Sequence, residues 1–251
     1  AAGEVLVGAW VAFADPYAAE ITASAGFDWL LIDGEHGPND LRSIMAQLRV
    51  IEASGTPALV RLPMGEDWAI KQALDIGVQS LLIPFVESAA DAARLVRATR
   101  YAPQGHRGVG AALARASGFA AIPDYMATVD AQIWLGVQVE SRAGLAALDE
   151  IAATPGVDGV FIGPADLSAD MGHPGEMDHP EVRAAIRDAL GRIAAAGKAP
   201  GIIWTEPALA ARAIAEGARF VATAIDVLTY ASAIRGAAAQ ARALRDTARG
   251  G

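Results

Sequence analysis

Short apolar segments alternate with helix-length amphipathic segments along most of the chain. The apolar segments are nearly continuous, which is typical of strands buried on both faces of a parallel sheet. Eight strands are predicted, at Val7–Phe13, Trp29–Glu35, Ala58–Leu62, Ser80–Val86, Ile133–Glu140, Gly159–Gly163, Gly201–Trp204 and Phe220–Ile225. The clearest amphipathic helices between them are Asn39–Ala53, Asp67–Ile76, Ala89–Arg100, Pro180–Ala196 and Pro207–Glu216.

Eight strands that alternate with helices predict an α/β fold, a (β/α)8 or TIM barrel, formed as a single domain over residues 1–251. A doubly wound open sheet has the same alternation. It is disfavoured because no Gly-x-Gly-x-x-Gly motif joins a strand to a helix; the nearest glycine cluster, Gly105–Gly110, follows a helix. Four further glycines stand where a helix must end before the next strand, at Gly26, Gly77, Gly197 and Gly217.

One long interval, Tyr101–Asp130, breaks the alternation between the fourth helix and the fifth strand. It contains prolines and glycines together with Arg107, Arg115 and Tyr125. A connection of this length is usually functional or disordered, and the alternative is an excursion that packs on the barrel rim.

Composition narrows the class of protein. Of 251 residues, 53% are apolar and 20% charged, which excludes a disordered chain. The absence of cysteine excludes disulfides and thiol chemistry, and a net charge of −9 argues against nucleic acid as a partner. No run reaches the roughly 18 apolar residues of a membrane span. The first basic residue is Arg42, so no signal peptide is predicted and we expect a cytoplasmic protein.

In a barrel of this type the active site lies at the carboxyl ends of the strands. Glu140 and Asp166 follow adjacent strands, where two unpaired carboxylates would repel each other. A hard divalent cation, Mg²⁺ or Mn²⁺, would relieve this repulsion, because all the available ligands are oxygens. The alternative is a salt bridge from Glu140 to Arg61 or Arg142. The other polar residues expected at strand ends are Asp33, Glu35, His36, Arg61 and Gln138.

His36 is the only one of four histidines predicted at the carboxyl end of a strand, where Asp33 and Glu35 could orient it as a base. A purely structural role is the alternative. Arg61 ends an apolar strand, so its guanidinium requires an anion, either a structural carboxylate or a substrate oxygen. The turn Gly163–Leu167 opens a short helix whose free N–H groups can hold a carboxylate or a phosphate.

The chain has only two lysines, Lys71 and Lys198. Lys71 is predicted in the middle of a helix, and Lys198 just before the seventh strand, away from the expected site. A Schiff-base aldolase or a pyridoxal phosphate enzyme needs a lysine in its pocket. We therefore expect no Schiff-base lysine and no pyridoxal phosphate. The lack of a Gly-x-Gly-x-x-Gly motif between a strand and a helix likewise predicts no nicotinamide cofactor.

Four motifs together resemble the class II, metal-dependent pyruvate aldolases, in particular the 4-hydroxy-2-oxoheptanedioate aldolases of aromatic degradation. They are Phe27–His36, Tyr101–Pro103, Arg107–Gly110 and Val157–Ser168, and the resemblance extends from about Val7 to the last helix. It implies a (β/α)8 barrel whose eighth helix is swapped between subunits, in a homo-hexamer built as a trimer of dimers.

The resemblance also implies roles for individual residues. Glu140 and Asp166 would be the metal ligands. Gln138 and Arg61 would contact the pyruvate part, with Arg61 at the keto or enolate oxygen. The backbone N–H groups of Ala165 and Asp166 would hold the substrate carboxylate.

The aldehyde half of the site is implied in the same way. His36 would be the catalytic base, paired with Asp75 of this chain or of a neighbouring subunit. Trp10 and Asp33 match positions that shape the pocket.

The implied reaction is reversible cleavage of a 4-hydroxy-2-oxo acid, such as 4-hydroxy-2-oxoheptanedioate, to pyruvate and an aldehyde such as succinic semialdehyde. It would pass through a pyruvate enolate stabilised by the metal and by Arg61. Three alternatives remain: a 2-keto-3-deoxy sugar-acid aldolase, an oxaloacetate decarboxylase and a non-catalytic barrel that binds keto acids.

Overall fold

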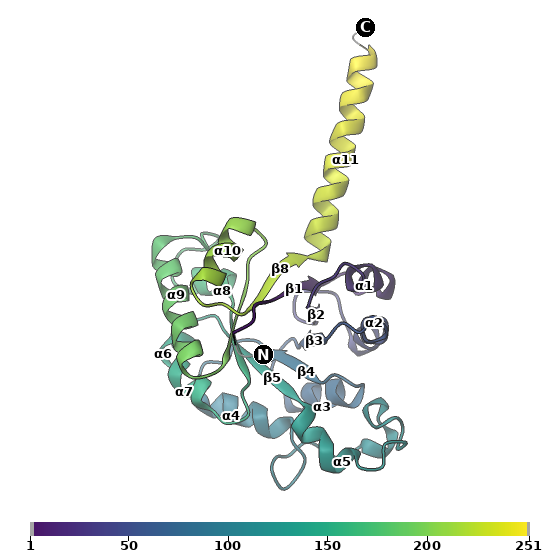
Figure 1. The fold of residues 1–251 in the computed structure, drawn as a ribbon, viewed down its shortest axis with the longest axis vertical. Coiled ribbons are helices and arrows are strands. Elements are labelled where there is room, and N and C mark those ends of the chain that lie inside the picture. Colours follow the sequence, from purple (N-terminus) through teal and green to yellow (C-terminus); the bar gives the residue numbers. More distant parts are fainter. Residues whose placement is uncertain (1–2, 250–251) are drawn as a thin grey trace.

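The computed structural model describes residues 3–249, and its strands close into a single parallel barrel (Figure 1). Each strand pairs with the next in the chain, and the last pairs with the first. This confirms the predicted α/β barrel. The strands are β1 (Leu6–Val11), β2 (Trp29–Asp33), β3 (Ala58–Arg61), β4 (Ser80–Ile83), β5 (Trp134–Val139), β6 (Gly159–Ile162), β7 (Ala199–Ile203) and β8 (Phe220–Ile225).

Helices surround the barrel and begin where the sequence offers caps. Asp40 accepts hydrogen bonds from the first turn of α2, and Ser88 does the same for α4. The helices are α1 (Pro16–Ala23), α2 (Leu41–Ser54), α3 (Asp67–Asp75), α4 (Ala89–Ala98), α5 (Tyr125–Thr128), α6 (Arg142–Ala146), α7 (Leu148–Ala153), α8 (Pro164–Asp170), α9 (Pro180–Ala195), α10 (Pro207–Ala215) and α11 (Asp226–Arg249).

Two apolar layers hold the fold together. Aliphatic side chains of the strands pack against the helices in the outer layer, and large aromatic side chains fill the inside of the barrel. Trp29 stacks on Phe220 with ring centroids 3.9 Å apart. The lumen is therefore a packed core, and only its carboxyl end is left for polar side chains.

Most strands end earlier than predicted, and β1, β2 and β4 do so by two or three residues. After β2, Asp33 accepts a hydrogen bond from the Glu35 backbone N–H at 3.0 Å, which turns the chain out of the sheet. β4 ends at Ile83, because Pro84 has no N–H to donate and Phe85 has a φ of 53°. The four glycines predicted to end helices have φ values between 74° and 113°, as such ends require.

The interval Tyr101–Asp130 forms an ordered excursion with turns of 3-10 helix at Ala111–Leu113 and Arg115–Ser117. It connects α4 to β5 and so lies at the amino ends of the strands, opposite to the predicted site. Arg107 is buried and bonds to Asp75 at the end of α3, at 2.7 Å. The excursion thus packs against the barrel, as in the alternative interpretation.

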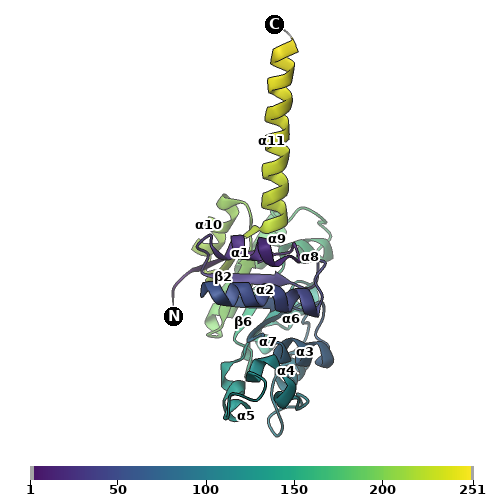
Figure 2. The same ribbon diagram turned by 90° about the vertical axis from the view of Figure 1, so that its right-hand side faces the viewer.

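The helix α11 leaves the barrel instead of packing along it (Figure 2). Its start is anchored by the Asp226 carboxylate, which accepts a hydrogen bond from the Ala12 backbone N–H at 2.9 Å. Beyond that point its apolar side chains are exposed, at Leu228, Tyr230, Ile234 and Leu244. Within residues 3–249, no helix combines the length and the apolar character needed to cross a membrane.

Candidate active site

A buried arginine marks the carboxyl end of the barrel. Arg61, the last residue of β3, donates from Nε to Asp33 at 2.9 Å, and its Nη1 lies 2.6 Å from a Glu35 oxygen. Its guanidinium lies 4.1 Å from the centre of the Trp10 ring. These contacts use Nε and Nη1, which leaves Nη2 for a ligand.

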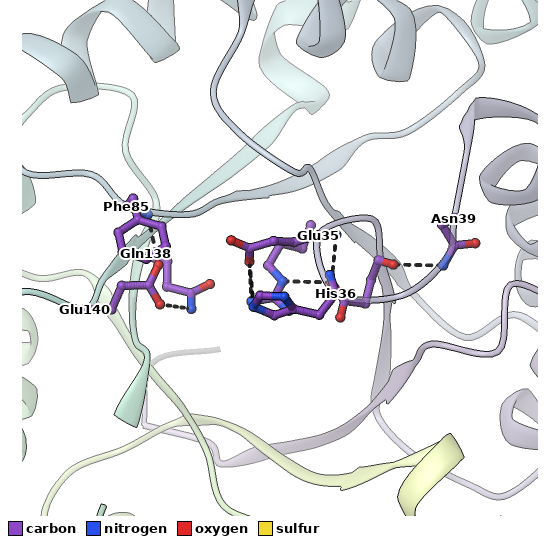
Figure 3. Close-up of polar contacts among 8 residues, drawn as sticks. Glu35, His36, Asn39, Phe85, Gln138 and Glu140 are labelled. Carbon is purple, nitrogen blue, oxygen red and sulfur yellow. Dashed lines mark hydrogen bonds and ion pairs between the residues drawn. The ribbon is translucent and has the colours of Figure 1, made fainter. Parts of the chain in front are cut away.

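A buried carboxylate follows the last residue of β5, at the same end of the barrel. Glu140 is 2% exposed and accepts a hydrogen bond from the Phe85 backbone N–H at 3.0 Å and another from the Gln138 amide (Figure 3). Burial, together with the negative charges of Asp166 and Glu35, raises the pKa of Glu140 to about 7. The salt bridge that is the alternative for Glu140 is absent from the described residues, since Arg61 pairs with Asp33 and Glu35, and Arg142 with α8 and Glu181.

The third component is the start of α8. Pro164 is its first residue, so the amides of Ala165 and Asp166 lie in the first turn, where N–H groups have no acceptor within the helix. Gly163 precedes them, and a Cβ there would collide with the Glu140 carboxylate and lie 2.8 Å from Gln138 Nε2. A glycine is therefore required for β6 to approach these side chains.

His36 lies at this end of the barrel, as predicted, with its side chain 67% exposed (Figure 3). Its Nε2 is 3.9 Å from a Glu35 oxygen. Asp75 lies at the end of α3, beside the amino ends of the strands, and it pairs with Arg107 of the same chain. Within one chain, His36 and Asp75 are therefore not partners, and their pairing between subunits remains a prediction.

Both lysines lie outside this end of the barrel. Lys71 is in the middle of α3, with its stem beside Gly108. Lys198 donates to the Val157 carbonyl at 2.6 Å, just before β7 begins.

The residues present suit a divalent metal and a polar ligand. Glu140 and Asp166 offer the oxygen ligands that Mg²⁺ prefers, and a cation there would relieve the repulsion between them. Gln138 Oε1 and Trp10 Nε1 are buried without a partner among the described residues. Such atoms usually have a partner, so they point to a ligand in this pocket.

Two groups of this site have no role assigned from the sequence. The sequence names Glu35 only as a neighbour of His36. In the structure, Glu35 shares Arg61 with Asp33, and burial raises the pKa of Glu35. The second group is the Phe85 backbone N–H, which donates to Glu140. This role could not be predicted from the sequence, because every residue except proline has a backbone N–H. Its only indication is the proline before it, which ends β4.

Comparison with known proteins identifies the family. The family model for HpcH/HpaI aldolase/citrate lyase matches residues 6–233. The chain belongs to this family. A hydroxypyruvate/pyruvate aldolase of Roseovarius nubinhibens is 59% identical over 94% of this chain and 91% of that protein. A 4-hydroxy-2-oxo-heptane-1,7-dioate aldolase of Salmonella dublin is 50% identical over 96% and 90%.

A solved structure agrees with this assignment. The crystal structure of an HpcH/HpaI aldolase/citrate lyase family protein from Burkholderia cenocepacia J2315 superimposes with a TM-score of 0.91 at 42% identity, covering 95% of each chain. The resemblance stated from the sequence motifs is confirmed, and the protein is an aldolase of the HpcH/HpaI family.

Proposed function

We propose that this aldolase joins and cleaves the bond between C3 of a pyruvate-type 2-oxo acid and the carbonyl carbon of an aldehyde. The observation that carries the proposal is Glu140, a buried carboxylate placed near Asp166 and Glu35. Arg61 is the buried cation at this end of the barrel, and two carboxylates already share it. Glu140 and Asp166 would therefore hold a divalent metal, Mg²⁺ or Mn²⁺.

The chain's own residues would each act on a different part of the substrate. The first-turn amides of Ala165 and Asp166 would hold the carboxylate, and Gln138 would orient the pyruvate part beside Glu140. Arg61 would place Nη2 at the keto oxygen, where negative charge develops as the enolate forms. A bound metal would supply further stabilisation of that charge.

His36 would move the proton at the aldehyde end. In cleavage it removes the proton of the C4 hydroxyl, the C3–C4 bond breaks, and its electron pair becomes the enolate double bond. Protonation at C3 then gives the free 2-oxo acid, and the other product leaves as the aldehyde. The His36 side chain is exposed within one chain, and we propose that Asp75 of a neighbouring subunit orients it.

The names of the relatives support two candidates for the substrate. Those named for hydroxypyruvate and pyruvate include the ones at 59% and 57% identity, which supports one of these two acids as the enolate donor. A second candidate is 4-hydroxy-2-oxoheptanedioate, cleaved to pyruvate and succinic semialdehyde, since relatives named for it are 48% and 50% identical.

We further propose that the protein assembles into a hexamer in which α11 packs on a neighbouring subunit. The feature that supports this is the projection of α11 with exposed apolar side chains (Figures 1 and 2). Apolar side chains gathered on an exposed, projecting helix are typical of an interaction site.

The decisive experiment incubates purified protein with pyruvate or hydroxypyruvate and a panel of aldehydes, succinic semialdehyde included. Each mixture is run with Mg²⁺, with Mn²⁺ and with EDTA. We expect aldol products only with metal. Full activity in EDTA would overturn the metal proposal, and decarboxylation of oxaloacetate without any aldol product would favour a decarboxylase.

A further inference from the structure

A second group of metal-ligating side chains lies away from the catalytic carboxylates. His173 is in the connection that follows α8, and His179 and Glu181 are at the start of α9 (Figure 1). One ring nitrogen of each histidine and one Glu181 oxygen all lie within 4.8 Å of one another. The group shares no residue with the site formed by Glu140 and Asp166.

The contacts inside this group already bring the donors together. His173 Nε2 lies 3.0 Å from Glu181 Oε2. The two imidazole rings stack with centroids 3.5 Å apart and an 18° angle between their planes. Half of the four histidines in the chain are thus concentrated beside one carboxylate.

Two imidazoles and one carboxylate are the donor set of many three-ligand zinc sites, which leave a fourth position for water. Bonds of about 2.0–2.1 Å to nitrogen in a tetrahedral site place the donor atoms roughly 3.4 Å apart. The 3.0 Å contact is close to this separation, and the widest separation of 4.8 Å must shrink. A metal ion binds a ring nitrogen in the plane of the imidazole. The two stacked rings must therefore rotate away from their parallel arrangement when the ion binds.

We propose that His173, His179 and Glu181 bind a zinc-type divalent cation, distinct in chemistry from the ion at Glu140 and Asp166. Imidazole nitrogen suits Zn²⁺ or Co²⁺, whereas an all-oxygen site suits Mg²⁺. The two sites therefore differ in the ions that their donor atoms suit best.

Two local features lower the expected affinity of this site for a cation. His179 Nδ1 accepts a hydrogen bond from the Glu181 backbone N–H at 3.3 Å, as the cap of α9, and the positive end of the helix dipole disfavours a cation there. Arg142 Nη2 lies 3.9 Å from the other Glu181 oxygen. We expect binding weaker than in an all-cysteine structural zinc site.

The bound ion would tie two elements together. The peptide N–H of His173 donates to the Ser168 carbonyl in α8 at 2.8 Å, and α8 also carries Asp166. An ion shared with Glu181 would fix the connection between α8 and α9. We therefore expect Zn²⁺ to raise the melting temperature of the Mg²⁺-saturated protein.

The test titrates Co²⁺ into protein saturated with Mg²⁺, at about pH 7.5, where unperturbed histidines are neutral. Visible absorption and calorimetry report the binding. We expect one Co²⁺ per chain in addition to any that replaces Mg²⁺ at Glu140 and Asp166. This ion should be displaced by Zn²⁺, and its affinity should fall on the order of 100-fold in His173→Gln and in His179→Asn. Asn retains an N-cap acceptor, so the second variant keeps α9 capped.

The matched control is His106→Gln. His106 Nε2 lies 2.8 Å from Asp67 Oδ2, so this variant also separates a histidine from a carboxylate, but at a place without a second imidazole. It should bind Co²⁺ like the unchanged protein. The proposal is overturned if no Co²⁺ binds beside Mg²⁺, or if the His173 and His179 variants bind it as the control does. Mg²⁺-dependent aldol activity, which tests the proposed function separately, should persist in all three variants.

Discussion

The two ends of the barrel each contain a buried arginine, and the two arginines are locally alike. The side chain of Arg61 is 4% exposed and that of Arg107 is 0% exposed. Each donates to an aspartate, Arg61 to Asp33 at 2.9 Å and Arg107 to Asp75 at 2.7 Å. Each guanidinium also lies over an aromatic ring, at 4.1 Å for Arg61 and 4.5 Å for Arg107.

The difference is the charge around them. Glu35, Glu140 and Asp166 lie at the same end as Arg61, so carboxylates outnumber cations there. At the other end, Arg115 pairs with Glu52 as Arg107 pairs with Asp75, and the charges balance. Burial of an arginine on an aromatic ring therefore does not by itself indicate catalysis. The surplus of buried carboxylates does, because only that end requires a further cation.

The largest expected effect comes from removing a ligand. Glu140→Ala or Asp166→Ala should lower metal-dependent turnover on the order of 1,000-fold or more, because a catalytic metal supplies several kcal/mol of charge stabilisation. Circular dichroism should show an intact fold. Glu52→Ala at the opposite end is the control, and it should keep the activity of the unchanged protein. Comparable losses in the control would contradict the assignment of the site.

The next effect distinguishes the role of His36 from the roles of the other residues in the site. His36→Ala should slow aldol cleavage by about 100- to 10,000-fold, the range of general base catalysis. Oxaloacetate decarboxylation requires no hydroxyl proton to be removed, so it should suffer less. Both rates are measured at saturating metal. An equal loss in the two reactions would instead favour a role for His36 in positioning water.

Matched substitutions of the two arginines test the comparison directly. Arg61→Met should slow oxaloacetate decarboxylation on the order of 100-fold, because the enolate loses a charge-stabilising contact. Arg107→Met should leave that rate nearly unchanged and lower the free energy of unfolding by about 1–3 kcal/mol, since Asp75 loses its partner. Urea unfolding and initial rates provide both quantities. If Arg107→Met slows the reaction as much as Arg61→Met, the comparison fails.

The smallest expected effect is a pH dependence. The pKa of Glu140 is raised from 4.5 to about 7, mainly by burial, and a cation must displace the proton. Mg²⁺ affinity should therefore fall below about pH 7, by up to about tenfold per unit, with proton release on binding. Calorimetry in two buffers of different ionisation enthalpy measures that release. Binding at pH 6 without any proton release would contradict the assignment.

The same shift has a consequence for the stability of the metal-free protein. Because the folded-state pKa of Glu140 lies above its ordinary value of 4.5, the fold binds this proton more tightly than the unfolded chain does. Its stabilising contribution is complete below about pH 4.5 and is lost as the pH rises through about 7. Thermal unfolding with and without Mg²⁺ should show the metal compensating for this loss at neutral pH.

Much of the fold could be predicted because parallel strands buried on both faces leave long apolar runs in the sequence. The end of β2 could not be predicted, because it stops where Asp33 accepts hydrogen bonds from the following turn, which does not interrupt the apolar pattern. The end of β4 was missed although Pro84 marks it, because the apolar residues Phe85 and Val86 continue the pattern beyond the proline.

The candidate site, like the fold, could be predicted only in part from the sequence. Glu140, Asp166 and Arg61 could be located from their places at strand ends, because barrel geometry brings those ends together. The proposed partnership of Asp75 with His36 could not be derived from one chain, because within it Asp75 pairs with Arg107 instead. The two ion pairs that Arg61 forms with Asp33 and Glu35 could not be predicted either. They depend on the geometry of the turn after β2, which the sequence indicates only weakly.

Gly163 makes the site sensitive at a position that has no functional group. Any side chain there, even the methyl group of alanine, would occupy the space of Glu140 and Gln138. In a library of single substitutions selected for aldolase activity, this position should tolerate almost no change, as if it were a metal ligand. Intolerance to mutation at Gly163 would thus reflect the close approach of two strands rather than any chemistry of its own.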